Sequence, residues 1–170
     1  MKISKATIEH IFSIMEIISH AQKYLAALEI DQWQNGYPNE ATILNDINHK
    51  ETYLVQNNNN EIMATAMFSV RPEPTYVTIQ GQWLTNQDAT YGVIHRMAVH
   101  NDFRNQGLAK FIFESCENYL KEQNIPSMRI DTHQDNKRMQ QLLTKIGYSP
   151  CGIIFLTDGN NRLAYEKLLI

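Results

Sequence analysis

Residues 94–113 read IHRMAVHNDFRNQGLAKFIF, and this stretch decides the fold. Its first part belongs to the mostly apolar segment Tyr91–His100, which predicts a buried β-strand. Asn101–Gly107 is polar and turn-forming, and Leu108–Leu120 carries apolar residues at helical spacing. A helix that starts directly after such a turn offers unpaired N–H groups and a partial positive charge. The stretch therefore predicts an anion site that suits a phosphate group.

Three residues in and after the turn support this interpretation. Gly107 lets the backbone approach a ligand closely, Ala109 keeps the next helical turn small, and Arg104 adds a forked cation. The resulting pattern is Arg-x-x-Gly-x-Ala. It lacks the Gly-Lys-Ser or Gly-Lys-Thr ending of a P-loop, and the chain has no Gly-x-Gly-x-x-Gly for a dinucleotide. The pattern alone is loose, and its position between a strand and a helix makes it informative.

The whole chain predicts one mixed α/β domain over residues 1–170, with a central sheet of about seven strands and about four helices. On the first helix, the apolar stripe expected to face inward is Ile8, Ile11, Phe12, Met15, Ile18 and Leu25. On the third, it is Phe111, Ile112, Cys116 and Tyr119. The predicted strands are Ile3–Ala6, Thr52–Gln56, Ile62–Val70, Tyr91–His100, Ser127–Thr132, Cys151–Thr157 and Arg162–Leu169, with a short one considered at Val77–Ile79. The predicted helices are Ile8–Leu25, Glu40–His49, Leu108–Leu120 and Asn136–Ile146, and the four asparagines 57–60 predict a hairpin turn.

Composition excludes several other classes of function. The net charge is −3 at pH 7, and no basic stripe supports nucleic-acid binding. Cys116 and Cys151 form no Cys-x-x-Cys pair, and the scattered histidines match no zinc spacing. The apolar segment 8–18 is too short and too interrupted to span a bilayer, and no signal peptide is recognised. We expect a cytoplasmic protein that uses no metal and binds neither membrane nor nucleic acid.

Residues 94–113 resemble motif A of the GNAT superfamily of N-acetyltransferases. In that motif an apolar strand ends near Ala-Val and is followed by a short turn and a helix. The turn and helix start carry the pattern Arg/Gln-x-x-Gly-x-Gly/Ala. Residues 129–152, RIDTHQDNKRMQQLLTKIGYSPCG, are similar to the family's later strand and Asn-headed helix, which ends in a Gly-aromatic pair. The resemblance implies a GNAT fold and an acetyl-CoA-dependent N-acetyltransferase.

The resemblance also implies which residues bind acetyl-CoA. The pyrophosphate would be held by backbone N–H groups of Arg104, Asn105, Gln106, Gly107, Leu108, Ala109 and Lys110. Met97, Ala98 and Val99 lie where the family's strand pairs with the pantetheine arm, and a bulge there frees one N–H for the thioester carbonyl. Asn136 heads the helix that often contacts the pantetheine. A plain N-cap is the alternative and is compatible with that role.

Direct transfer to an amine needs a general base, because an alkyl ammonium has a pKa of about 10.4. His95 is the first candidate, since a two-residue period places it on the same face as Met97 and Val99. The alternative is that His95 only packs or bonds to a loop. His133 is the second candidate, with Asp131 to orient it. The favoured alternative is that both bond only the backbone around the turn.

The general acid is not evident from the sequence. Many family members have a tyrosine four residues before the glycine that ends the Asn-headed helix, and this position is Leu143 here. Tyr148 and Tyr165 are substitutes, although aromatic residues at such places are more often core. A thiolate is also a good leaving group on its own. Cys151 has no neighbour in sequence that would lower its pKa, so a covalent route through it is disfavoured.

The acceptor is expected to be a primary amine, on a small molecule rather than a protein. The proposed pocket residues are Trp33, Glu73, Tyr76 and Trp83, which offer apolar walls and a polar anchor. Two alternatives remain open: both tryptophans plug the ends of the domain, and Glu73, also considered as a base, is a surface residue. The absent tyrosine at position 143 keeps a second function in play, a non-catalytic acyl-CoA-binding or sensing domain. The sequence is compatible with a homodimer and leaves the oligomeric state and acyl-chain preference open.

Overall fold

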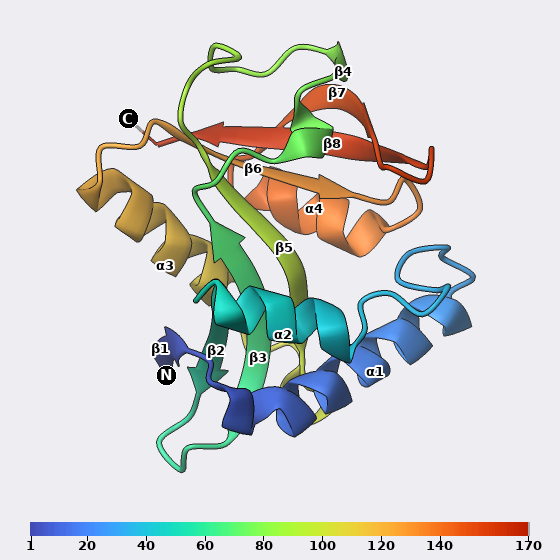
Figure 1. Ribbon diagram of the computed structural model, residues 1–170, viewed down its shortest axis with the longest axis vertical. Helices are drawn as coiled ribbons and strands as arrows, with labels where there is room; N and C mark the ends of the chain where they lie inside the picture. The colour runs from blue at the N-terminus through green and yellow to red at the C-terminus, as the bar shows by residue number, and fades with distance from the viewer. Residues whose placement is uncertain (170) are drawn as a thin grey trace. The chain divides into compact units, whose positions relative to one another are not determined.

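The computed structural model describes residues 1–169, which contain four α-helices and eight β-strands (Figure 1). The helices are α1 (Ile11–Ala27), α2 (Glu40–Asn48), α3 (Leu108–Glu122) and α4 (Lys137–Lys145). The strands are β1 (Lys2–Lys5), β2 (Thr52–Gln56), β3 (Ile62–Ser69), β4 (Ile79–Gly81), β5 (Gly92–Val99), β6 (Ser127–Thr132), β7 (Ser149–Phe155) and β8 (Asn161–Leu168). Their hydrogen-bonded order is β1-β2-β3-β5-β6-β8-β7-β4. This confirms the predicted α/β class with a mixed sheet, and short β4 raises the strand count above the expected seven.

The chain divides into two compact units, each described by itself below. The first unit comprises residues 1–68 and 95–115, and the second comprises residues 69–94 and 116–170. Strand β5 contributes to both, because Gly92–Ile94 belong to the second unit and His95–Val99 to the first. That residues 1–170 act as one domain stays a prediction.

The first unit begins with an antiparallel ladder of β1, β2 and β3. The turn between β2 and β3 is the predicted asparagine hairpin. The side-chain oxygen of Asn57 accepts hydrogen bonds from the N–H groups of Asn59 (2.9 Å) and Glu61 (3.0 Å). Asn60 takes a φ of 62°, which asparagine tolerates better than most residues. The asparagine tract therefore forms the turn that its composition predicts.

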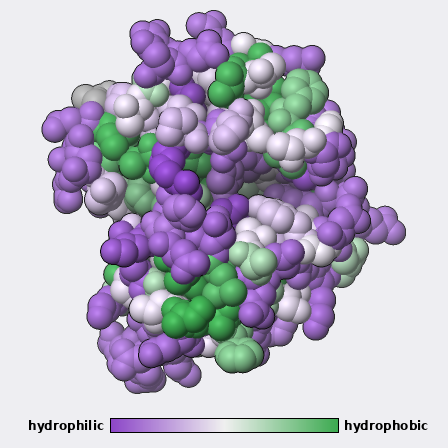
Figure 2. Space-filling view, viewed as in Figure 1, coloured by the Kyte–Doolittle hydropathy of each residue, from purple (hydrophilic) through white to green (hydrophobic). Residues whose placement is uncertain are grey.

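Helix α1 packs its isoleucines into the core of the first unit. Ile14, Ile17 and Ile18 are at most 1% exposed and belong to the same hydrophobic core cluster as Ile43 and Ile47 of α2. The prediction that Ile8 and Phe12 face inward was wrong, because they are 58% and 85% exposed. Ile8 lies in a separate 3₁₀ turn (Ile8–His10), and Phe12 is rotated about 100° from Ile11. Figure 2 shows apolar surface where Figure 1 draws the start of α1.

The second unit holds the antiparallel strands β6, β8, β7 and β4, together with the first residues of β5. The parallel ladder between β5 and β6 consists of two pairs, Gly92↔Met128 and Val93↔Arg129. The short strand considered at Val77–Ile79 lies slightly later, at Ile79–Gly81. Gly81 and Gly152 are register partners whose backbones pass so closely that a Cβ on either would overlap the other strand. Glycine at both positions is what allows β4 to pair there.

The inward stripe of α3 differs in part from the prediction. Ile112 and Cys116 are buried as expected, but Tyr119 is 45% exposed and Phe111 is only partly buried. Leu120 is 0% exposed instead, because Ile112, Cys116 and Leu120 follow the four-residue spacing of one helical face. In the part of the chain that the structure describes, no helix is long and apolar enough to cross a membrane.

Candidate functional site

Strand β5 bends at Arg96, in the middle of the predicted pantetheine strand. Arg96 has a φ of 50°, the left-handed region that residues other than glycine seldom enter. The alternating in-and-out pattern of a strand requires unbroken extended backbone. His95, Arg96 and Met97 are accordingly all partly buried in succession, while Ala98 is buried and Val99 partly buried. The premise that His95 shares a face with Met97 and Val99 therefore does not hold across Arg96.

The Arg96 side chain is held by a buried carboxylate in α2. Its Nε donates to Asp46 Oδ2 at 2.6 Å and its Nη2 donates to Asp46 Oδ1 at 2.9 Å, a two-point fork. Its Nη1 donates to the Tyr37 hydroxyl at 2.7 Å. Burial alone would lower the pKa of Arg96, but Tyr37 and Asp46 outweigh burial and raise it. The guanidinium is therefore always charged and has a partner at each of its three nitrogens.

Asp46 is 3% exposed, so it relies on this pairing. Burial raises the pKa of the Asp46 carboxyl, and the charge and hydrogen bonds of Arg96 offset part of the rise. The imidazole of His95 also acts to lower the pKa of Asp46. His95 is thus within electrostatic reach of the Arg96–Asp46 pair, although sequence reasoning treated it alone.

The loop after β5 contains the residues that the sequence predicts to bind phosphate. The N–H of His100 donates to the Met63 carbonyl of β3 at 2.8 Å, which fixes the end of the strand. A 3₁₀ turn (Asn101–Phe103) follows, and the Arg104 guanidinium lies 4.2 Å from the centre of the Tyr24 ring. Gly107 has a φ of 78°. The turn is therefore anchored to β3 on one side and to α1 on the other.

Three backbone N–H groups precede the first hydrogen bond of helix α3. The N–H of Phe111 donates to the Gly107 carbonyl at 3.0 Å, so the N–H groups of Leu108, Ala109 and Lys110 precede this first helical bond. A Cβ on Gly107 would have no atom within 4 Å, so the space beside the turn is open. Asn105 and Gln106 are exposed, and Asn105 has a φ of 63°.

Residues 108–110 differ in what they do for the helix start. Leu108 is 2% exposed and anchors the helix in the core, while Ala109 is partly buried. The ammonium of Lys110 lies 3.5 Å from the Glu114 carboxylate, an exposed pair one helical turn apart. The backbone of the turn is therefore fixed by Leu108, whereas the charge of Lys110 stays at the surface.

Asn136 and His133 lie in the second unit, at the turn before α4. The Asn136 side chain accepts a hydrogen bond from the Met139 N–H at 3.1 Å and so caps α4. Nδ1 of His133 accepts from the Asp135 N–H at 3.2 Å, and the His133 carbonyl accepts from Gln140 Nε2 at 3.3 Å. His133 thus bonds the backbone of its own turn. Its catalytic role, like the pantetheine role of Asn136, stays a prediction.

Three of the predicted acceptor residues also lie in the second unit. Tyr76 is 1% exposed, and its hydroxyl donates to Asp131 Oδ2 at 2.8 Å. Burial and the Asp131 carboxylate raise its pKa well above the ordinary value. Trp83 is 5% exposed, and its indole N–H donates to the Tyr76 carbonyl at 3.0 Å. Glu73 accepts from the Thr75 N–H at 3.1 Å and caps a 3₁₀ turn (Pro74–Tyr76).

The remaining predicted acceptor residue, Trp33, lies in the first unit. It is partly buried, has a φ of 62° and packs against the core that α1 and α2 share. Tyr76 and Trp83 also belong to a core, that of the second unit. That these aromatics line an acceptor pocket stays a prediction.

The candidates for a general acid or a covalent nucleophile are buried. Leu143, which occupies the position of the tyrosine that the resemblance leads one to expect, is itself 0% exposed. The Tyr148 hydroxyl donates to Glu117 Oε1 at 3.1 Å, and burial raises its pKa far above the ordinary value. Burial likewise raises the pKa of Tyr165 and of the Cys151 thiol. Protonated thiols are poor nucleophiles, so these surroundings argue against a covalent route through Cys151.

Sequence reasoning missed the Tyr37–Arg96–Asp46 cluster. One signal was present, because Asp46 lies between Ile43 and Ile47 on the inward face of α2. A carboxylate on an apolar helix face indicates a buried partner. Nothing in the sequence named Arg96 as that partner. Among residues 1–169, no group of three or more His, Cys, Asp or Glu side chains is placed to hold a metal ion.

Comparison with known proteins agrees with this geometry. The sequence model of the acetyltransferase (GNAT) family matches residues 18–148. No curated protein matches the sequence significantly. Among solved structures, a GNAT-family acetyltransferase from Streptococcus agalactiae is 34% identical with a TM-score of 0.87, and the match covers 98% of this chain and 94% of that one.

More distant structures share the fold alone. A GNAT-family acetyltransferase from Listeria monocytogenes is 17% identical with a TM-score of 0.77, over 98% of this chain and 94% of that one. The ribosomal-protein-S18-alanine N-acetyltransferase from Escherichia coli is 16% identical with a TM-score of 0.62, over 99% and 93%. The family match and the Streptococcus structure together cover nearly the whole chain. The chain therefore belongs to the GNAT family of acetyltransferases, whose members are acyltransferases, and its α/β fold is the fold of that family.

Proposed function

We propose that this protein is an acetyl-CoA-dependent N-acetyltransferase that acts on the primary amine of a small molecule in the cytoplasm. The observation that carries the proposal is the turn from β5 into α3. Its glycine has positive φ and open space beside it, and three backbone N–H groups precede the first helical bond. A helix start of this kind binds phosphate oxygens. The residues present therefore fit the pyrophosphate of coenzyme A.

The residues proposed to bind acetyl-CoA divide into two groups. Arg104 to Lys110 would hold the pyrophosphate, mainly through backbone N–H groups, and Met97 to Val99 would pair with the pantetheine arm. Asn136 is proposed as a further contact. Acetyl-CoA supplies an acetyl group activated as a thioester. The chain's own task is to bind it, to bring an amine to it and to accept a proton.

His95 is proposed as the group that removes the amine proton. An alkyl ammonium has a pKa of about 10.4, so at neutral pH a base must take a proton before the nitrogen can react. His95 lies in β5 directly before the kink, in the same unit as the phosphate turn. His133 is the second candidate, and its turn-bonded imidazole supports it less. We propose no cysteine intermediate, because both thiols are buried.

Leu143 favours one competing function, a domain that binds acyl-CoA without catalysis. This residue is fully buried at the position where many relatives have a tyrosine acid. A thiolate leaves readily, since a thiol has a pKa of about 8.5, and so the missing tyrosine does not preclude transfer. Both functions would use the turn from β5 into α3 to bind the cofactor. Only the enzyme would also transfer the acyl group.

Calorimetric titration with acetyl-CoA tests the proposal, with coenzyme A and ATP as comparison ligands. We expect micromolar binding by the wild type, followed by release of free thiol when a panel of primary amines is added. Gly107→Glu is expected to abolish binding, because it places a carboxylate where the pyrophosphate lies. The matched control is Gly159→Glu, since Gly159 also has positive φ (84°) and no atom within 4 Å of its Cβ.

The outcomes separate the possibilities. Loss of binding in Gly107→Glu but not in Gly159→Glu supports the proposed site. Equal binding by both variants would place the cofactor elsewhere. Binding without turnover across the amine panel would favour the non-catalytic domain, and no binding by a folded wild type would remove both functions.

A further inference from the structure

We propose that Arg96 is a positioning residue whose buried ion pair with Asp46 locks the left-handed kink of β5. The lock would hold the backbone of Met97–Val99 in the one conformation that pairs with the cofactor. This inference rests on the proposed function, because that function assigns Met97–Val99 to the pantetheine arm. Arg96 itself would touch neither substrate, and its effect would pass through the strand.

The kink is a conformation that needs support. With a φ of 50°, Arg96 brings its Cβ close to its own carbonyl oxygen, a clash that glycine avoids. A residue in this region persists only when its surroundings hold it there. The kink also lies between His95 and Met97, two residues proposed for the site. A change in backbone at Arg96 would therefore redirect both of them.

Asp46 supplies the support from a rigid element. Two parallel hydrogen bonds, 2.6 and 2.9 Å long, fix the plane of the guanidinium as well as its distance. Asp46 is itself fixed, because the neighbouring Ile43 and Ile47 are buried in the core of the first unit. The N-terminus of α2 is capped by the Asn39 side chain, which accepts from the Thr42 N–H at 3.0 Å. The far end of Arg96 is thus held by a packed and capped helix.

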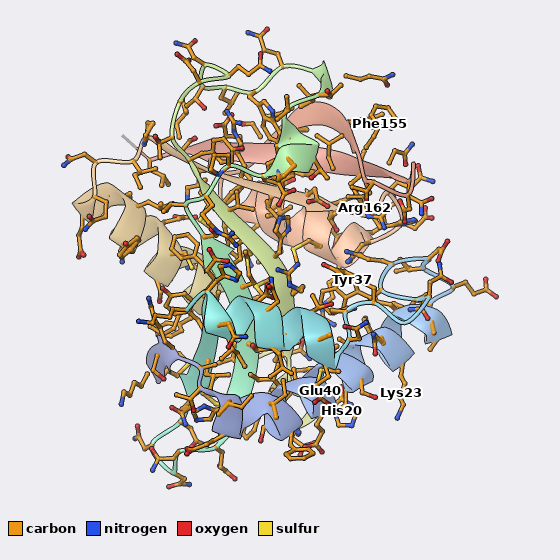
Figure 3. All side chains as sticks on the ribbon, in the orientation of Figure 1. His20, Lys23, Tyr37, Glu40, Phe155 and Arg162 are labelled. Carbon is orange, nitrogen blue, oxygen red and sulfur yellow. The ribbon has the colours of Figure 1, made fainter. Side chains whose placement is uncertain are left out.

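Tyr37 completes the cluster from the loop between α1 and α2 (Figure 3). Its hydroxyl accepts from Arg96 Nη1 at 2.7 Å. The loop is held as well, because Gln22 Nε2 donates to the carbonyls of Tyr37 (3.0 Å) and Pro38 (3.1 Å). Every nitrogen of Arg96 therefore bonds within the protein. Three of its five N–H donors are thereby used inside the protein, which suits a positioning role.

The test compares two substitutions at the same position. Both Arg96→Ala and Arg96→Gly remove the lock and leave Asp46 equally unpaired, but only glycine accepts a φ of 50° without a Cβ clash. We expect Arg96→Ala to move the ¹⁵N–¹H signals of Met97, Ala98 and Val99. We also expect about tenfold weaker acetyl-CoA binding. This is the loss that results if only about one molecule in ten has the binding conformation, because the apparent affinity falls in proportion to that fraction. Arg96→Gly should lie between Arg96→Ala and the wild type in both measurements.

A matched pair of controls separates positioning from loss of stability. Asn60 has a φ of 62° in the exposed turn between β2 and β3, so Asn60→Ala and Asn60→Gly make the same comparison away from β5. We expect Asn60→Ala to unfold at lower denaturant than Asn60→Gly, with the signals of residues 97–99 and the acetyl-CoA affinity unchanged. Should an unpaired Asp46 prevent folding, both Arg96 variants are made with Asp46→Asn, which leaves no buried charge.

Any of three results would overturn the inference. The first is a set of 97–99 signals in Arg96→Ala that overlays the wild type, which would mean that the kink needs no lock. The second is an Arg96→Gly variant no closer to the wild type than Arg96→Ala, and the third is an Asn60→Ala variant that loses as much affinity. If the wild type does not bind acetyl-CoA, the proposed function fails, while the ligand-free signals still decide whether Arg96 holds the strand.

Discussion

Glu166→Gln in β8 is expected to destabilise the second unit strongly. Glu166 is 0% exposed and accepts from five donors: the N–H groups of Leu84 and Thr85, the hydroxyls of Thr85 and Ser127, and Arg129 Nε. Arg129 is 1% exposed, and its guanidinium lies 4.4 Å from the ring centre of Trp83 and 3.9 Å from that of Tyr91. The carboxylate therefore ties the loop before β5 to β6 and neutralises a buried cation.

The size of the stability loss follows from the interactions that an amide at position 166 cannot make. Glutamine keeps the size of glutamate, but it turns one acceptor oxygen into a donor that faces other donors, and Arg129 loses its counter-charge. Breaking a buried ion pair by removing one partner destabilises a protein by about 3–5 kcal/mol. In a chain of this length, about 1 kcal/mol changes the melting temperature by roughly 2–4 °C. We therefore expect a melting temperature about 6–20 °C lower.

Thermal unfolding followed by fluorescence measures this change in melting temperature, and urea unfolding measures the free energy lost. The protein has two tryptophans, Trp33 in the first unit and Trp83 in the second, so a Trp33→Phe background leaves Trp83 as the only reporter. The matched control is Glu122→Gln, the same substitution at an exposed residue of the second unit. Exposed substitutions of this kind change stability by no more than about 0.5 kcal/mol.

The pH dependence of stability provides an independent test of the role of the Glu166 carboxylate. Burial would raise the pKa of Glu166, but hydrogen bonds from Ser127 and Thr85 and the charge of Arg129 outweigh burial and lower it. A lowered folded-state pKa stabilises the fold fully above the unfolded pKa of about 4.3, and this stability is lost as pH falls through the folded pKa. The gap in unfolding midpoint between wild type and Glu166→Gln should therefore be wider at pH 7 than at pH 3. Equal unfolding midpoints at pH 7, or a gap that does not change with pH, would refute this reasoning.

Two further predictions concern burial. In α1, Ile14→Ala removes a side chain that is 0% exposed and should lower the free energy of unfolding by about 2–5 kcal/mol. Phe12→Ser changes a side chain that is 85% exposed and should lower it by no more than about 0.5 kcal/mol. Urea unfolding compares the two variants, and a larger loss of stability in Phe12→Ser would contradict the packing of α1. Burial raises the pKa of Cys116 to about 12. Iodoacetamide at pH 7.4 should therefore leave this thiol unlabelled in the folded protein and label it in urea, as measured by peptide mass spectrometry. Rapid labelling of the folded protein would contradict the burial of Cys116.

The parts of the fold that sequence predicted well are those whose signal is local. Strands β2 and β6 have the bounds expected from their apolar runs, and the asparagine turn is where composition places it. The strand–turn–helix arrangement around Arg104, Gly107 and Ala109 was also predicted from a local pattern, because these residues lie within six positions between β5 and α3. Such features depend on dihedral preferences and hydrogen bonds between near neighbours, which the residue types alone specify.

Features that depend on distant partners were missed or misplaced. The Arg96–Asp46 pair joins residues fifty positions apart, and the partner of a buried charge is set by tertiary packing. The kink at Arg96 was invisible for the same reason, since arginine has no preference for positive φ and only its surroundings hold it. Phe12 and Tyr119 were misplaced because an error of one position rotates a helical side chain by about 100°.

The ion pairs Arg129–Glu166 and Arg96–Asp46 differ in what they hold. Arg129 and Glu166 are register partners on β6 and β8, where ladder hydrogen bonds already fix the backbone, and their pair adds the loop around Thr85. Arg96 lies at a backbone position that no ladder geometry favours, and Asp46 comes from a helix rather than a neighbouring strand. Removing the first pair should therefore lower stability and leave the strand conformation unchanged. Removing the second should change the conformation of β5 itself. The ¹⁵N–¹H signals of residues 97–99 in the ligand-free protein therefore distinguish the two roles, whereas unfolding midpoints do not.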